Sequence, residues 1–438
     1  MLSILDLYSK LPYINFYQYP PLIKASQQQM TNLEQILQLD KTLSDVFTIY
    51  LSIPFCQSHC NSCIFFKELL PKNVNKIDFL QDYLDYVFKQ IEFFGRTQRF
   101  SKSICKAIYI GGGTPSLLDS KQVEQIVYNL RKNFRLADDV EITLEGNPSD
   151  FTKEYFKEIH SGGINRLSLG IQSFQNNTLQ KIGSPHITEN NLNALSWAMK
   201  ENFYTVNCDL LYGIPGQTFS EWKYEIRKIL SFSPQSITIY SYIIHDNSRT
   251  KKLIKKGILD SPISEEDKYK MYAWASKILK ENDYIEQRKG NFHLKNHEQL
   301  YGLYSYIKMK ESIGFGVGAY SFINENLFKI GNSSKEYKEK IKDGRVIIGD
   351  FQSIYSTRRN IMERYIFHNL STYDLNRLEF KNRFKRDPIN VFVDEFKLLE
   401  KNNFIKIQKE NVLITEKGKK RLENIMYLFY DKHFNKFI

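Results

Sequence analysis

From about Phe47 onward, short apolar runs rich in β-branched residues alternate with longer amphipathic stretches. The short runs predict strands at Phe47–Ile53, Ala107–Ile110, Val140–Glu145, Arg166–Gly170, Thr205–Leu211 and Ile237–Ile243. The amphipathic stretches predict helices at Ser120–Phe134, Lys153–Ser161, Glu189–Asn202 and Thr218–Ser231. Strands that alternate with helices indicate a parallel sheet of right-handed βαβ units. Ligands of such sheets bind at the carboxyl ends of the strands.

A polar segment, residues 244–264, predicts a connection to a long helix at Glu265–Glu281. The glycine-dense Ile313–Phe322 predicts a last strand or loop that returns to the sheet. After about Tyr355 the alternation of strands and helices stops. Helical patterns follow at Asn360–His368 and Asp387–Lys401. Two short apolar runs, Phe404–Ile407 and Val412–Thr415, and a last helix end the chain.

The change in the pattern of strands and helices predicts that the chain has three structural regions. Residues 1–45 would be an N-terminal extension that packs on a barrel of residues 46–325. Residues 326–438 would form a small C-terminal α+β domain of helices and a β-wing, similar to a winged helix.

Composition narrows the class of protein. With 42% hydrophobic and 14% aromatic residues, the chain of 438 residues is not mostly disordered. No stretch approaches the roughly 18 apolar residues of a membrane span, and Met1–Lys10 lacks the features of a signal peptide. Five cysteines, an odd number, do not make a disulfide framework. We therefore expect a cytoplasmic, reducing setting.

The net charge of +12 is less informative. The densest basic run, Lys417–Arg421, is short, and no interleaved aromatic residues accompany it as in a nucleic-acid surface. A solvated surface is the favoured interpretation, and a docking patch for a polyanionic ligand is the alternative.

Three of the five cysteines lie within eight residues, at Cys56, Cys60 and Cys63. Soft thiolates at such spacing favour an iron–sulfur cluster or zinc. A cubane cluster with three cysteine ligands leaves one iron open to a further ligand. The alternatives are a zinc site completed by His59, or three buried thiols. We interpret the two other cysteines, Cys105 and Cys208, as core thiols.

Further motifs follow the cysteines in order: Gly111–Pro115, Leu144–Pro148, Leu169–Phe174 and Asp209–Gln217, after Tyr50–Cys56. Together they resemble the radical S-adenosylmethionine (SAM) enzymes of the oxygen-independent coproporphyrinogen III oxidase superfamily. Related heme chaperones, anaerobic heme-degrading methyltransferases and radical C-methyltransferases belong to the same grouping. The resemblance covers about residues 47–325, and the C-terminal part more loosely.

The resemblance implies a partial (βα)6 parallel barrel and a 4Fe-4S cluster on Cys56, Cys60 and Cys63. SAM would chelate the open iron, and one electron from a cytoplasmic donor would release a 5′-deoxyadenosyl radical. The residues that the resemblance places near SAM are Tyr50, Gly112, Gly113, Thr114, Glu145, Gln172 and Asp209. Heme or a second SAM is a further possible cofactor, and Gly314–Ala319 matches a loop on that side of the barrel.

Four departures from the family pattern concern positions that separate its branches. Ser62 replaces an aromatic residue, Phe65 a further cysteine, Ser52 a histidine and Ser184 an arginine, although Lys181 is close to the last. The first hypothesis remains an oxidoreductase that acts on a tetrapyrrole, whose propionates suit a basic chain. The alternatives are a heme chaperone and a radical C-methyltransferase. His293 and His297, at helical spacing, are expected at the surface without a metal.

Overall fold

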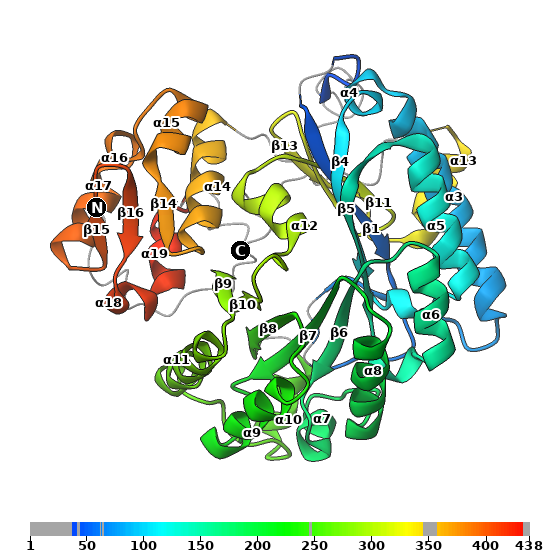
Figure 1. Ribbon diagram of the computed structural model, residues 1–438, viewed down its shortest axis with the longest axis horizontal. Helices are drawn as coiled ribbons and strands as arrows, with labels where there is room; N and C mark the ends of the chain where they lie inside the picture. The colour runs from blue at the N-terminus through cyan, green and yellow to red at the C-terminus, as the bar shows by residue number, and fades with distance from the viewer. Residues whose placement is uncertain are drawn as a thin grey trace.

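The computed structural model describes residues 37–41, 44–61, 63, 65–244, 248–344 and 357–431. Its largest sheet contains six consecutive parallel strands in chain order (Figure 1). These are β1 (Val46–Ile53), β4 (Ile104–Gly112), β5 (Arg135–Gly146), β6 (Arg166–Gln172), β7 (Thr205–Tyr212) and β8 (Ser236–Ser241). The six predicted strands are therefore confirmed, with β4 and β5 starting earlier than predicted.

Further strands extend this sheet at both sides. On one side, β11 (Glu311–Phe315) pairs in parallel with β1 and is followed by β12 (Tyr320–Ile323) and β13 (Asn326–Lys329). On the other, the antiparallel hairpin of β9 (Ile285–Arg288) and β10 (Asn291–His293) joins β8. Strands β13 and β9 are the two edges, so the described sheet is an open, partial barrel.

Amphipathic helices cover the outer face of the sheet, and their apolar sides join one large core with the strands. They are α3 (Lys76–Arg96), α5 (Ser120–Asn133), α6 (Lys153–Ser161), α8 (Thr188–Lys200), α9 (Phe219–Leu230) and α11 (Glu265–Glu281). Shorter helices are α4 (Gln98–Ser101), α7 (Asn176–Lys181) and α13 (Ser334–Lys342). The four helices predicted between the strands are confirmed to within two residues at each end.

Three sequence predictions need correction. The predicted connection 244–264 contains a helix, α10 (Arg249–Lys255), which Ser248 caps through its side chain. The predicted helix Asp387–Lys401 is two helices, α16 (Pro388–Val391) and α17 (Val393–Lys401), because Phe392 between them leaves helical geometry (φ −119°, ψ 53°). His293 does not lie on a helix at the surface but is buried in β10.

The C-terminal segment has a core of its own. It consists of α14 (Arg358–Leu370), β14 (Asp374–Asn376), α15 (Arg377–Phe384), α16, α17, β15 (Ile405–Ile407), β16 (Asn411–Ile414), α18 (Glu416–Lys419) and α19 (Leu422–Leu428). Its three strands form a separate sheet, β14-β16-β15. Helices followed by this small sheet agree with the predicted α+β character.

This segment faces the open side of the barrel (Figure 1). Between the two lie α12 (Leu300–Gly302) and a π-helical turn, Leu303–Ile307. The division at residues 45 and 325 remains a prediction: most of the N-terminal extension lies outside the described residues, although Leu37 and Leu39 join the barrel core. No helix in the described residues is long and apolar enough to cross a membrane.

Candidate functional site

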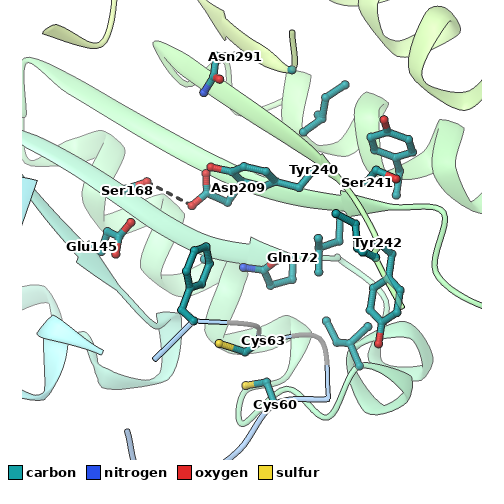
Figure 2. A pocket seen from close by; sticks show the side chains of 18 of the residues that line it. Cys60, Cys63, Glu145, Ser168, Gln172, Asp209, Tyr240, Ser241, Tyr242 and Asn291 are labelled. Atoms are coloured by element: carbon teal, nitrogen blue, oxygen red, sulfur yellow. Dashed lines mark hydrogen bonds between the residues drawn. The ribbon is translucent and has the colours of Figure 1, made fainter. Parts of the chain in front are cut away.

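One cavity of about 1950 Å³ opens at the carboxyl ends of the parallel strands and extends toward the C-terminal segment. Every residue that the sequence placed near the cluster or SAM lines it: Tyr50, Cys56, Cys60, Cys63, Gly112, Gly113, Thr114, Glu145, Gln172 and Asp209. Figure 2 shows Cys60 and Cys63 on one wall, with Gln172, Glu145 and Asp209 on the strands beside them. The structure therefore brings the motifs together, while the role of each residue stays a prediction.

Hydrogen bonds fix the segment that carries Cys56, Cys60 and Cys63. Cys56 ends β2 (Phe55–Cys56), which pairs in parallel with β3 (Glu68–Leu69), and its sulfur accepts a hydrogen bond from Thr114 Oγ1 at 3.3 Å. The loop that follows is pinned by the hydrogen bond from Asn61 N to Ile182 O, at 2.9 Å. Burial raises the pKa of Cys60 to about 11, and the neighbouring thiols add to the effect.

Three thiols line one cavity, a donor set that iron–sulfur clusters use. Within the described residues, no three His, Cys, Asp or Glu side chains converge closely enough to hold one metal ion. In a cubane each thiolate binds a different iron, so its cysteines lie further apart than ligands of one zinc. His59, the fourth ligand of the zinc alternative, is exposed and does not line the cavity.

The glycine motif brings backbone close to the cavity. Gly112 has φ +120°, and a Cβ there would lie 2.8 Å from Ser52 Oγ, which donates a buried hydrogen bond to Val317 O. At Gly113 a Cβ would lie 2.6 Å from the carbonyl oxygen of Phe55. A side chain does not fit at either position, because the backbone of residues 53–55, at the end of β1 and just after it, passes directly beside the motif.

Two carboxyl groups stand on adjacent parts of the cavity wall. Glu145, at the end of β5, accepts a 2.5 Å hydrogen bond from the Tyr109 hydroxyl, and the Tyr109 ring stacks on that of Tyr50 with centroids 5.9 Å apart. Burial raises the pKa of Glu145 to about 7, with a smaller effect of the negative charge on Asp209. The carboxyl group can therefore hold a proton near neutrality, or bind a cationic or hydroxyl group of a ligand.

Asp209 is oriented by a buried polar network across three strands. Its oxygens accept hydrogen bonds from Ser168 Oγ at 3.2 Å, drawn in Figure 2, and from Asn207 Nδ2 at 2.9 Å. The side-chain oxygen Oδ1 of Asn207 in turn accepts hydrogen bonds from the hydroxyl groups of Ser236, at 2.8 Å, and Thr238, at 3.0 Å. Burial raises the pKa of Asp209 to about 6, although these donors oppose the shift.

Gln172 lies in a strained turn that a buried glutamate secures. Its φ is +62°, an unusual value for a residue with a side chain. On α9, the fully buried Glu225 accepts hydrogen bonds from Ser173 Oγ at 2.6 Å, Phe174 N at 2.7 Å and Gln175 Nε2 at 2.7 Å. The three residues after Gln172 are thereby tied to one helix.

Sequence reasoning missed the supporting residues of the site. Tyr109, Ser168, Asn207 and Glu225 came from no motif, although Asn207 and Asp209 are polar at two-residue spacing in an apolar strand, which indicates one shared face. Lys67, which also lines the cavity, donates to Cys63 O at 3.3 Å.

The remaining candidates are placed as follows. Cys105 and Cys208 are fully buried in the core, as predicted. His297, expected at the surface, is half-buried and shares a 3.0 Å hydrogen bond with Thr205. Ser184 lines the cavity, whereas Lys181 pairs with Asp260 at 3.1 Å. Ser62 lies outside the described residues.

Comparisons with known proteins agree with this geometry. Residues 50–229 match the profile of the Radical SAM superfamily. The heme chaperone HemW of Lactococcus lactis is 28% identical over 381 residues, which are 87% of this chain and 96% of that protein. The oxygen-independent coproporphyrinogen III oxidase of Escherichia coli is 23% identical over 404 residues, or 87% of this chain and 85% of the oxidase.

Among solved structures, coproporphyrinogen III oxidase (HemN) from Escherichia coli superposes with a TM-score of 0.77 over 91% of this chain and 93% of that one. At 21% identity this likeness establishes the fold. Residues 50–229 therefore match the Radical SAM superfamily, and the chain is similar, along most of its length, to proteins named as heme chaperones and as oxygen-independent coproporphyrinogen III oxidase.

Proposed function

We propose that this chain is a heme-binding chaperone that keeps a 4Fe-4S cluster and SAM in the same cavity as its tetrapyrrole. The first hypothesis from the sequence, an oxidoreductase, thus becomes the second candidate. Relatives named heme chaperones, which align at 26–28% identity with 84–87% of this chain and 95–96% of their own length, support this order. Phe65, in place of a further cysteine of the oxidase, agrees with it.

At one end of the cavity, Cys56, Cys60 and Cys63 would hold the cluster. When bound, the cluster supplies the electron that cleaves SAM to a 5′-deoxyadenosyl radical. Gly112 and Gly113 give SAM close access to backbone, and Glu145 and Asp209 offer oriented oxygens to its hydroxyl and ammonium groups. Tyr109 keeps the Glu145 carboxyl group in place.

Exposed apolar and aromatic side chains line the same cavity, including Phe65, Tyr240 and Ile243, which are 60%, 42% and 44% exposed. Lysines stand among them: Lys251, Lys255, Lys268 and Lys420. A flat apolar ring system with carboxylate substituents, such as heme, matches this combination. The presence of three thiols, exposed aromatic rings and lysines in one cavity is the observation that carries the proposal.

The test is titration of the anaerobically reconstituted protein with hemin, followed by absorbance. We expect saturation at one heme per chain, with the heme recovered unchanged by mass spectrometry. Tyr240→Ala should weaken binding several-fold, while Tyr128→Ala, an exposed tyrosine on α5 away from the cavity, should not. Failure of the wild-type chain to bind hemin would refute the proposal.

The second candidate is a radical SAM enzyme that transforms a tetrapyrrole. The complete set of predicted SAM-side residues around the cavity favours it. Dithionite and SAM should then yield 5′-deoxyadenosine in proportion to a tetrapyrrole product of altered mass. A radical C-methyltransferase would instead release S-adenosylhomocysteine and add a methyl group. Recovery of heme of unchanged mass together with 5′-deoxyadenosine would count against both enzymes, the one that transforms a tetrapyrrole and the C-methyltransferase.

A further inference from the structure

One side of helix α10 is a row of positive charges that faces solvent. Arg249, Lys252 and Lys256 follow one another at intervals of three and four residues, so their side chains share one side of the helix. All three are exposed and none of them lines the cavity. None forms an ion pair within the described part of the chain. We call these three residues the basic face.

The opposite side of α10 holds the loop of the cysteine triplet. The buried Thr250 donates a hydrogen bond from Oγ1 to Asn61 O, at 3.2 Å, and Asn61 directly follows Cys60. The hydroxyl of Tyr242, just after β8, lies 2.6 Å from Thr250 Oγ1 and therefore donates to it. Asn61 N in turn donates to the carbonyl oxygen of Ile182, just after α7. The loop is thus held between α7 and α10, which lie at the same end of the barrel (Figure 1).

The end of α10 places an apolar side chain close to the basic face. Gly257, with φ +69°, ends the helix and donates from its N–H to Ile254 O at 2.9 Å. Ile258 N donates to Leu253 O at 3.0 Å. These two bonds fix Ile258 only two residues after Lys256, where its side chain is 63% exposed. An apolar side chain beside exposed charges agrees with the composition of a protein–protein contact.

We propose that the basic face of α10 docks an acidic one-electron donor protein, which delivers its electron to the cluster across this helix. The inference rests on the cluster of the proposed function and does not depend on the tetrapyrrole. In this step the donor is oxidised by one electron and the cluster is reduced by one, and no proton or covalent bond is exchanged.

Charge and position both support this partner. Positive side chains without a partner attract a surface of opposite charge and speed its approach. A protein on the basic face is separated from the cysteine loop by the width of one helix, about 10–12 Å. The cavity side of the loop is taken by SAM and tetrapyrrole in the proposed function, so a protein donor has to approach from outside. A short helix suffices, because complexes of electron-transfer proteins bury little surface.

The first measurement is the affinity of an acidic plant-type ferredoxin for the anaerobically reconstituted chain, by calorimetry at low and at high salt. The variants are Lys252→Glu, Lys256→Glu and the matched control Lys157→Glu. Lys157 is an exposed lysine of α6, away from the cavity and without an ion pair in the described residues. We expect the two α10 variants to bind about tenfold more weakly at low salt, a difference that high salt removes. Lys252→Arg, which keeps the charge, and the control should bind as the wild type does.

The second measurement is the rate of cluster reduction, followed by rapid-freeze electron paramagnetic resonance. Reduced ferredoxin is compared with dithionite, a small reductant that needs no docking surface. The rate with ferredoxin should fall in Lys252→Glu and Lys256→Glu in step with the affinity. The rate with dithionite should be the same in all variants, and each should show the full absorbance of the cluster.

Equal affinity of ferredoxin for the wild type, Lys252→Glu and Lys256→Glu would overturn the docking surface, and so would a wild type that does not bind ferredoxin. Vesicles of anionic lipid provide a further check. If the wild type binds them, the two variants do not, and ferredoxin affinity is unchanged, the basic face contacts a membrane and the proposal is wrong. A wild-type chain without cluster absorbance after reconstitution would instead refute the cluster, and with it the proposed function, before any ferredoxin is added.

Discussion

Glu145 shows how its surroundings change the chemistry of a single side chain. Its pKa of about 7 exceeds the usual value near 4.5, because burial disfavours the charged form. The folded state then binds a proton more tightly than the unfolded state does. The stabilisation is fully present below pH 4.5 and is lost as the pH rises through 7.

We therefore predict that the free energy of unfolding of the ligand-free protein falls by about 1–2 kcal/mol from Glu145 between pH 4.5 and 7.5, allowing for partial solvent access. Glu145→Gln, which cannot ionise, should reduce this slope. Urea unfolding at the two pH values measures it. Asp209, with a pKa of about 6, contributes in the same direction and keeps its share in the variant. An unchanged slope in Glu145→Gln would contradict the raised pKa.

The cysteines give a second prediction for single residues. Cys56→Ala, Cys60→Ala and Cys63→Ala should each abolish the visible absorbance of the reconstituted cluster and the cleavage of SAM, because a cubane loses an iron ligand. Cys105→Ala is the matched control: this thiol is fully buried in the core, away from the cavity. It should lose some stability and keep the absorbance. A triplet variant with normal absorbance would refute the assignment.

The turn after β4 depends on a glycine at one position. Gly112→Ala should lower the free energy of unfolding by about 2–4 kcal/mol, because φ +120° is unfavourable for alanine and its Cβ would meet Ser52 and Ile53. Gly257→Ala is the control, with φ +69° and no atom within 4 Å of the added Cβ. It should lose only about 1 kcal/mol. Equal losses in urea unfolding would show that crowding at Gly112 is unimportant.

The turn after β6 depends on helix α9. Glu225→Gln replaces one acceptor oxygen by a donor, so at least one of the three bonded groups in residues 173–175 loses its partner. We expect a loss of about 2–4 kcal/mol in the free energy of unfolding and weaker SAM binding. Glu221→Gln, on the same helix, affects only an exposed capping box at Thr218 and should cost at most about 1 kcal/mol. Calorimetric SAM titration and urea unfolding would test both, and unchanged SAM affinity in Glu225→Gln would contradict the positioning role.

Across the whole molecule, one buried carboxylate joins the barrel to the C-terminal segment. Glu286 of β9 accepts hydrogen bonds from Tyr272 on α11, from Tyr373 at 3.2 Å and from Lys280 at 2.8 Å. Nearby, Lys289 pairs with Glu423 of α19. These contacts tie the barrel to the C-terminal segment, which contributes Glu423 to the lining of the cavity.

Glu286→Ala should therefore loosen the C-terminal segment, because it removes the acceptor that Tyr272 and Tyr373 share and leaves their two hydroxyl groups with the hydrogen bond between them alone. We expect faster hydrogen exchange in α14 and β14–β16, measured by mass spectrometry, and weaker hemin binding. Glu281→Ala on α11, where an exposed carboxylate pairs with Lys277, is the control and should change neither. Unchanged exchange in Glu286→Ala would show that the segment is held by other contacts.

The sequence by itself determined the strand–helix alternation and the ordered motifs, because hydrophobic periodicity and backbone-restricted turns are local properties. The alternation predicted a parallel sheet, and the carboxyl ends of parallel strands lie at one edge of the sheet, where the motifs were therefore expected. Only the tertiary structure decided which polar residues support that edge. Glu225 is 52 positions from Ser173, and Tyr373 is 87 positions from Glu286. No local pattern records such pairs, because burial and folding bring their side chains together, and the same burial sets the pKa of Glu145.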